Sequence, residues 1–123
     1  MAYVLVADDE PALRTAIHRT LEDAGHEVAD AENGEACEAS IESRLPDLVI
    51  LDMVMPKKEG IEVIADLRGR HPRLKILAIS GGGRSASGTD FLTFAKRFGA
   101  NATLEKPFDA PTLLATVKTL LAA

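Results

Sequence analysis

Residues 46–52 read Pro46-Asp47-Leu48-Val49-Ile50-Leu51-Asp52, a short apolar run that follows a proline and ends on a carboxylate. Other apolar runs also lead to polar groups: Tyr3–Ala7 before Asp8 and Asp9, Ile76–Ile79 before Ser80, and Ala102–Leu104 shortly before Lys106. If these runs are parallel strands, their carboxyl ends share one edge of a sheet. That edge would carry a carboxylate cluster, a hydroxyl and an ammonium group. Such groups together can bind a divalent cation and a phosphoryl group.

The segments between these runs carry helical patterns. Pro11 suits the first turn of a helix, and Leu13, Ile17 and Leu21 then recur every four residues. A weaker strand is predicted at Glu27–Ala31, and Asn33 and Asp109 are suitable helix N-caps. Further apolar stripes are predicted at Ile61, Ile64 and Ala65; at Phe91, Phe94, Ala95 and Phe98; and at Leu113, Val117, Leu120 and Leu121. Strand and helix thus alternate five times, which predicts an α/β fold with a doubly wound parallel sheet and helices on both faces.

Length and composition predict one soluble domain over residues 1–123. The apolar runs are far shorter than the roughly 20 residues that cross a bilayer, and the first one is interrupted by acidic residues, so we expect neither a membrane segment nor a signal peptide. The lone Cys37 is interpreted as a packing residue, and a cytoplasmic location is expected. The net charge is −5, and the densest basic group, Arg68 to Arg73, is interpreted as a solvated helix end, which argues against nucleic-acid binding.

The polar groups at the strand ends have two interpretations. Asp8 and Asp9 can share a site with Asp52 only if the chain turns after the first strand, and three close carboxylates repel one another unless a cation joins them. Mg²⁺ prefers such oxygen ligands. Taken singly, the acidic pair could cap a helix, Asp52 could cap a loop, and Lys106 could be a surface lysine. Four suitable groups at four strand ends favour the shared site.

The set Asp8-Asp9, Leu51-Asp52-Met53-Val54-Met55-Pro56, Gly60, Ser80 and Lys106-Pro107-Phe108 resembles the receiver domain of two-component response regulators. The resemblance covers essentially the whole chain, in order. It implies a flavodoxin-like (βα)5 sheet in the order 2-1-3-4-5 and a single-domain, chemotaxis-regulator-like protein without an effector domain. The implied function is to accept a phosphoryl group and pass on the signal by protein contact or by phosphate relay.

The resemblance also implies residue roles. Asp52 would be the phosphoacceptor, with a sensor histidine kinase or a histidine phosphotransferase as the donor. Asp8, Asp9, Asp52 and the backbone carbonyl of Val54 would hold Mg²⁺, for which Mn²⁺ could substitute. Lys106 would pair with the phosphoryl oxygens across a cis Lys106-Pro107 peptide, and the Ser80 hydroxyl would bond another oxygen.

Two features depart from the family pattern. Thr103 stands where many receivers have an aromatic ring three residues before the lysine, so the signal would pass through Ser80, the following loop or the backbone. The loop that starts at Gly81-Gly82-Gly83 is longer than usual, and it is either a tolerated insertion or a segment that brings Arg84 over the site. Residues 87–90 also resemble a capping box for the fourth helix.

Partner contacts are expected on the fourth helix, fifth strand and fifth helix, where Phe91, Phe94 and Phe98 are candidates with most of their rings in the core. The protein would be a monomer or a weak, activation-dependent dimer. One alternative is a binding module that signals without phosphorylation. Another is an aspartyl phosphatase, which the sequence disfavours because Val54 stands where such enzymes place an acid/base aspartate. Slow loss of the domain's own phosphoryl group is therefore the only turnover expected.

Overall fold

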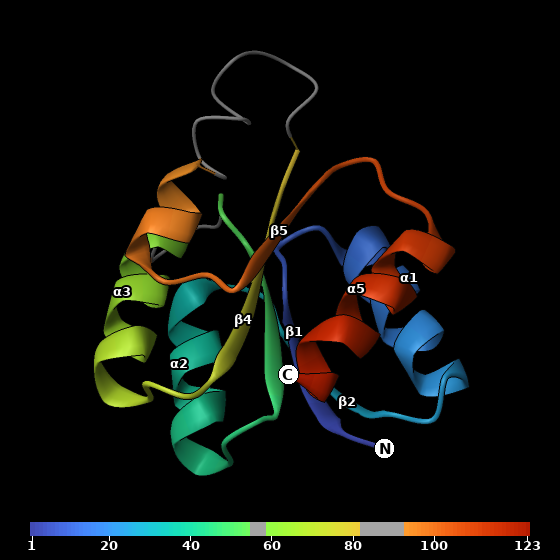
Figure 1. The fold of residues 1–123 in the computed structure, drawn as a ribbon, viewed down its shortest axis with the longest axis horizontal. Helices are drawn as coiled ribbons and strands as arrows, with labels where there is room; N and C mark the ends of the chain where they lie inside the picture. Colours follow the sequence, from blue (N-terminus) through green and yellow to red (C-terminus); the bar gives the residue numbers. More distant parts are fainter. Residues whose placement is uncertain (55–58, 82–92) are drawn as a thin grey trace.

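The computed structural model describes residues 1–54, 59–81 and 93–123 (Figure 1). The strands are β1 (Tyr3–Ala7), β2 (Glu27–Ala31), β3 (Leu48–Asp52), β4 (Lys75–Ser80) and β5 (Ala102–Glu105). The helices are α1 (Pro11–Asp23), α2 (Gly34–Ser43), α3 (Gly60–Arg70) and α5 (Ala110–Ala122), and residues 93–98 are also helical. All strand pairs are parallel and the order is β2-β1-β3-β4-β5, which confirms the predicted fold class and strand order.

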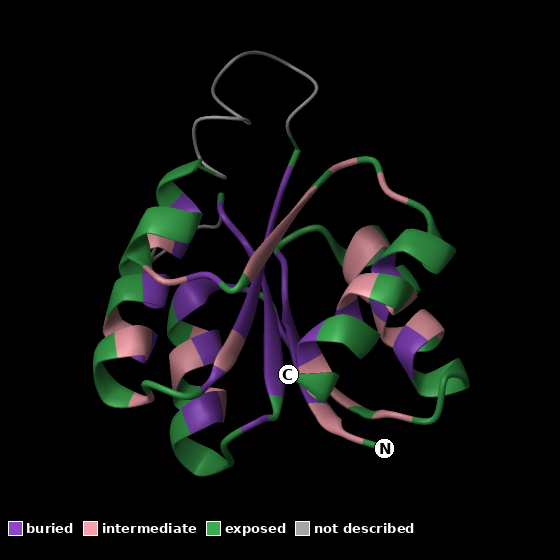
Figure 2. Ribbon diagram, viewed as in Figure 1, coloured by how far each residue is buried: buried purple, intermediate pink, exposed green. Residues whose placement is uncertain are grey.

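The sheet separates two apolar cores, because successive strand side chains point to opposite faces. On β1, Val4 and Val6 face α1 and α5, whereas Leu5 and Ala7 face α2 and α3. β3 and β4 alternate in the same way and are almost completely buried (Figure 2). The two strands are apolar on both faces because helices cover both sides.

Strand register brings the polar strand ends together. Ala7 pairs with Leu51, so the next residue on each strand, Asp8 and Asp52, emerges at the same edge of the sheet. Asp52 in turn pairs with Ile79, and Ser80 pairs with Glu105, the residue before Lys106. The neighbouring strands β1, β3, β4 and β5 therefore deliver their functional groups to one place, as expected for parallel strands.

The predicted helix boundaries follow from local chemistry. Pro11 begins α1, and Gly25, with a φ of 95°, follows its end. The Asn33 side chain accepts a hydrogen bond of 2.8 Å from the Ala36 N–H, and Asp109 accepts one of 2.8 Å from the Thr112 N–H. Both residues are therefore N-caps, as predicted.

Two predicted helix faces are wrong in part. On α3 the buried residues include Val63, Ile64 and Leu67, whereas Ala65 is exposed. On the helical residues 93–98, Ala95 is fully buried, but Phe94 and Phe98 are 43% and 47% exposed. The small Ala95 packs in the core while both rings are largely exposed, so these rings are not the core residues we expected. Phe91 lies outside the described residues.

Within the described ranges, no helix is long and apolar enough to cross a membrane. The basic residue Arg68 is not solvated as expected. Its guanidinium donates hydrogen bonds to the carbonyl oxygens of Gly99, His71 and Pro72 and to the Asn101 side chain, because it packs between α3 and the connection to β5. Cys37 is fully buried, and burial raises the pKa of its thiol to about 12, in agreement with a packing role.

Candidate functional site

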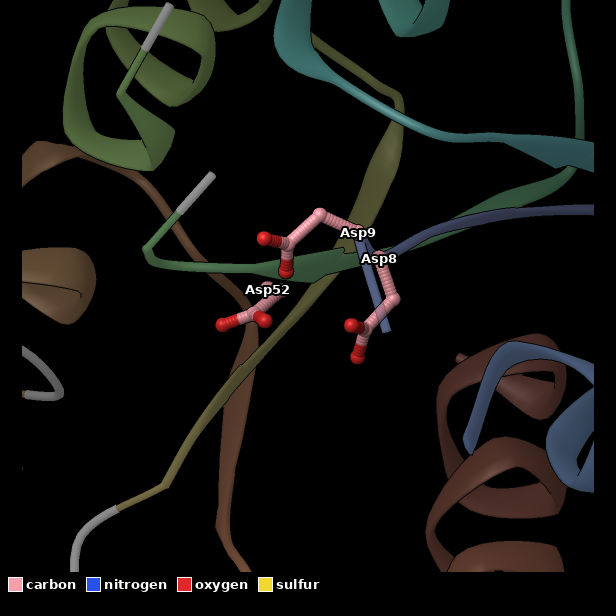
Figure 3. A group of neighbouring side chains, drawn as sticks. All are labelled: Asp8, Asp9 and Asp52. Atoms are coloured by element: carbon pink, nitrogen blue, oxygen red, sulfur yellow. The ribbon is translucent and has the colours of Figure 1, made fainter. Parts of the chain in front are cut away.

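Three carboxylates meet at the carboxyl edge of the sheet. One oxygen each from Asp8, Asp9 and Asp52 lies within 4.8 Å of the others (Figure 3). Asp8 is fully buried and Asp52 is 4% exposed, whereas Asp9 is exposed to solvent. The predicted grouping of these three residues is present, and their charges face one another over a short distance.

A turn after β1 places both Asp8 and Asp9 in this cluster. The Asp8 Oδ1 atom accepts a hydrogen bond of 2.9 Å from the backbone N–H of Glu10. This bond closes the turn just before α1 begins at Pro11. The interpretation of the acidic pair as a helix cap is incomplete, because the N-cap residue Glu10 makes no side-chain capping bond and Asp8 points into the cluster.

Lys106 brings a positive charge to the carboxylates at this edge. Its Nζ atom lies 3.2 Å from the Asp52 Oδ2 atom and 3.3 Å from the Asp8 Oδ2 atom. The contact with Asp52 is a hydrogen bond, and the buried Asp8 Oδ2 atom forms an ion pair with the same ammonium group. The Lys106-Pro107 peptide is cis, as predicted, and the Lys106 N–H donates to the Ser80 carbonyl at 2.7 Å. Lys106 is therefore tied to the ends of both β4 and β5.

Burial is the main cause of an unusual acidity at Asp52. Desolvation raises the pKa of its carboxyl group from 3.8 to about 6. The N–H of Val54 lowers the pKa by hydrogen bonding, the charge of Asp8 raises it further, and Lys106 lowers it. For Lys106, burial lowers the pKa, but attraction to Asp52 and Asp8 outweighs burial and leaves the pKa above its usual value. The ammonium group therefore stays charged at neutral pH.

Gly60 supports the site through its lack of a side chain, a role that the sequence did not reveal. A Cβ atom at this position would lie 2.6 Å from the Met53 Cα atom and 2.9 Å from the Asp52 carbonyl oxygen. The Gly60 N–H also donates to the Met53 carbonyl at 3.2 Å. The start of α3 therefore packs directly on the backbone that carries Asp52, which only glycine permits.

The remaining predicted residues lie around this centre. Ser80 is buried at the end of β4, and Thr103 is half-buried on β5 opposite Ala78. Val54 lies two residues after Asp52 in the turn, is 56% exposed, and donates its N–H to the Asp52 Oδ1 atom at 3.1 Å. The predicted roles of the Val54 carbonyl and the Ser80 hydroxyl stay predictions. Arg84 and the predicted capping box at 87–90 lie outside the described residues.

The donor set fits a small, hard cation. Asp8, Asp9 and Asp52 supply carboxylate oxygens, and within the described residues the partner of the buried Asp8 Oδ2 atom is the Lys106 ammonium, 3.3 Å away. Mg²⁺ takes such oxygens and keeps several water ligands, which the exposed side of Asp9 allows. Among the described residues, this cluster contains no nitrogen or sulfur ligand of the kind that softer metals prefer.

The sequence model of the response regulator receiver domain matches residues 4–118, so this chain belongs to that family. Receiver domains are the signalling domains of two-component systems. They bind Mg²⁺ in an acidic pocket and interact with histidine kinases or phosphotransfer proteins and with downstream effectors. They are not enzymes in the usual sense.

Individual relatives agree with this assignment. The chain is 34% identical over 119 residues to the alkaline phosphatase synthesis transcriptional regulatory protein PhoP of Bacillus subtilis, covering 96% of this chain and 48% of that protein. It is 33% identical over 115 residues to the chemotaxis protein CheY of Listeria monocytogenes, covering 93% of each. The receiver domain of NtrX from Brucella abortus superposes with a TM-score of 0.90 at 32% identity, covering 98% of each chain. The chain thus spans about half the length of PhoP and most of the length of CheY.

Proposed function

We propose that Asp52 accepts a phosphoryl group from a phosphohistidine of a sensor histidine kinase or a histidine phosphotransferase. A carboxylate oxygen of Asp52 forms the new P–O bond while the P–N bond of the donor breaks. The imidazole nitrogen leaves with the bonding electron pair and later takes up a proton. The observation that carries the proposal is the position of Asp52, buried between two other carboxylates and 3.2 Å from the Lys106 ammonium.

The surrounding residues have distinct roles in this proposal. Asp8 and Asp9, with Asp52 and the Val54 carbonyl, would hold Mg²⁺ or Mn²⁺, and the ion would reduce repulsion between the anionic nucleophile and the anionic phosphoryl group. Lys106 exchanges its contact with the Asp52 carboxylate for one with a phosphoryl oxygen. Ser80 donates its hydroxyl to another of these oxygens. Positioning and charge stabilisation of this kind supply most of the catalysis in phosphoryl transfer.

The phosphorylated state would be long-lived because the position where aspartyl phosphatases place an acid/base aspartate is occupied by Val54. Val54 occupies the exposed position two residues after Asp52, and its side chain cannot activate water. Slow autodephosphorylation is therefore the only turnover proposed. Thr103 offers no ring to reorient, so Ser80 and the adjoining backbone would transmit the change.

The output surface is proposed to include residues 93–98, β5 and α5. The exposed rings of Phe94 and Phe98 support this choice, because aromatic side chains are enriched at protein interfaces. We further propose that the receiver domain signals on its own by protein contact or phosphate relay, as a monomer or as a weak dimer on activation. The near-complete match to the chemotaxis protein CheY of Listeria monocytogenes supports this view.

Intact mass measured after incubation with acetyl phosphate tests the proposed chemistry. Wild type with Mg²⁺ should gain one phosphoryl group, and wild type in EDTA and Asp52→Asn with Mg²⁺ should not. An adduct that persists in Asp52→Asn would refute the assignment of the acceptor. If no adduct forms with either acetyl phosphate or a phosphorylated phosphotransfer protein, a binding module that signals without phosphorylation replaces the proposal.

A further inference from the structure

The backbone of Asp8 is fixed by an arginine that the proposed chemistry does not use. Arg14, on the first turn of α1, donates from Nη1 to the Asp8 carbonyl oxygen at 2.6 Å. On the other side, the Asp8 N–H donates to the Ala31 carbonyl of β2 at 3.1 Å. The backbone of Asp8 is thus held on one side by the edge strand β2 and on the other by α1.

These contacts decide which carboxylate oxygen of Asp8 faces the site. Its Oδ1 atom is taken by the Glu10 N–H at 2.9 Å. Its Oδ2 atom is buried and pairs at 3.3 Å with the Lys106 Nζ atom, which also contacts Asp52, so Oδ2 is the Asp8 oxygen on the side of the cluster. If the backbone of this turn shifted, the Asp8 Oδ2 atom would no longer face the other carboxylates, although the residue itself would be unchanged.

The turn needs a stabilising contact from outside, because strand geometry would point the Asp8 and Asp9 side chains in opposite directions. Successive strand residues point to opposite faces, so the chain must leave the strand conformation for Asp8 and Asp9 to share one site. The Asp8 carbonyl lies beyond the last β1–β3 pair, which joins Ala7 to Leu51. A guanidinium is suited to the tie, because it stays charged and forms strong hydrogen bonds to oxygen.

Arg14 positions the backbone of Asp8, and within the described residues it makes no ion pair with the carboxylates of the site. Within the described parts of the chain, its side chain bonds to the Asp8 carbonyl, and the carboxylates of Asp8 and Asp52 pair with Lys106. Its removal therefore leaves the nucleophile and its cationic partner in place. The effect should fall on cation binding and spare the transfer step.

We infer that Arg14 is a positioning residue of the cation site, which aims the Asp8 Oδ2 atom at the ion by fixing the turn between β1 and α1. The inference rests on the proposed Mg²⁺ site. Removing the outer partner of a metal ligand typically weakens metal binding about 10- to 100-fold. Because Arg14 holds a backbone oxygen and does not bond the ligating carboxylate, the expected loss for Arg14→Ala is near the lower end, about 10-fold.

Magnesium titration of the unphosphorylated protein tests this inference without relying on activity. A cation that binds the folded protein raises the unfolding temperature, so the Mg²⁺ dependence of this temperature reports affinity. Arg14→Ala should need about tenfold more Mg²⁺ than wild type for the same rise, and Arg14→Lys, which keeps one donor, should recover part of the loss. Arg19→Ala, an exposed arginine on the same helix, is the matched control and should behave as wild type.

Phosphorylation by acetyl phosphate then separates positioning from chemistry. The Mg²⁺ concentration for half-maximal rate should shift in Arg14→Ala by the same factor as the binding curve, with a maximal rate within about twofold of wild type. Equal Mg²⁺ dependence in Arg14→Ala and Arg19→Ala would overturn the inference, as would a lower maximal rate with unchanged Mg²⁺ dependence. If Arg14→Ala does not fold, Arg14→Gln is titrated by the same criteria. If Mg²⁺ stabilises wild type normally but no phosphoryl adduct forms, the proposed function is rejected. The role of Arg14 in cation binding is then judged from the Mg²⁺ titration alone.

Discussion

Replacing Asp52 by asparagine should stabilise the metal-free protein at neutral pH, although it removes the proposed nucleophile. The Asp52 carboxyl group is 4% exposed, and burial raises its pKa from 3.8 to about 6. One pKa unit corresponds to about 1.4 kcal/mol, so ionised Asp52 reduces folding stability by up to about 3 kcal/mol at pH 7. Asparagine has the same shape and carries no charge to desolvate.

The expected net gain is smaller than this limit. The limit already includes the attraction of Lys106, but asparagine replaces one of two accepting carboxylate oxygens with an NH2 group that faces the Val54 N–H or the Lys106 ammonium, which offsets about 1 kcal/mol. A net stabilisation of about 1–2 kcal/mol remains, and for a domain of this size it raises the unfolding temperature by several degrees. Asp9→Asn is the matched control. Asp9 belongs to the same cluster but is exposed, so its neutralisation relieves repulsion without relieving burial and should change stability less.

The pH dependence gives this prediction its sharpest test. Because the pKa of Asp52 is raised on folding, the folded state binds the extra proton, and the associated stability is complete below pH 3.8 and lost as pH rises through about 6. The stability difference between Asp52→Asn and wild type should therefore be small at pH 4.5 and largest above pH 7. Urea unfolding in EDTA at both pH values measures it. A difference that is absent at pH 7.5, or that does not change with pH, would refute the reasoning.

Three further substitutions test other parts of the structure. Gly60→Ala should destabilise the protein by about 1–3 kcal/mol in urea unfolding and slow phosphorylation, whereas Gly69→Ala on the same helix, where the new methyl group meets open space, should be neutral or stabilising. Equal effects would contradict the steric argument. Asn33→Ala should lower stability by about 1 kcal/mol through loss of the α2 cap, and Asn33→Asp should retain most of it. The hydrogen bond to Asp30 raises the pKa of His18, so its contribution is present below pH 6.5 and disappears as pH rises through the raised pKa. The stability advantage of wild type over His18→Gln should accordingly be larger at pH 6 than at pH 9, and the opposite trend would show the pair to be unimportant.

The strands and their polar ends were predictable because one simple rule governs them. A central parallel strand is buried on both faces, so an apolar run such as Leu48–Leu51 is conspicuous, and the group that follows it must lie at the sheet edge. The same rule places Asp8, Asp52 and Ser80 at one edge of the sheet from the sequence alone. Family resemblance added the strand order and the cis peptide bond, which spacing alone does not specify.

The errors arise where a pattern is compatible with more than one tertiary arrangement. A stripe containing Phe94, Ala95 and Phe98 identifies a helix, but it does not say whether the rings or the small residue face the core. Gly60 was named only as part of the family pattern and Arg14 was not named at all, and their structural roles were missed for a related reason. Their roles depend on backbone atoms from other segments, the Met53 Cα atom and the Asp8 carbonyl, and no local sequence signal marks such contacts.

The charges of the site explain why cation binding and phosphorylation of Asp52 would influence each other. Three carboxylates and the Lys106 ammonium leave two negative charges in a partly buried space when all are ionised. A bound divalent cation would balance them and would favour the ionised, nucleophilic form of Asp52, whose pKa burial otherwise raises. Phosphorylation converts one carboxylate into a group with more negative charge and more acceptor oxygens, which competes for Lys106 and for the cation. Since Lys106 is also bonded through its N–H to the end of β4, a change in the position of its ammonium group would be felt at Ser80 and in the chain that follows. The connection between charge at Asp52 and the shape of the neighbouring strand ends is thus built from contacts already present in the unphosphorylated protein.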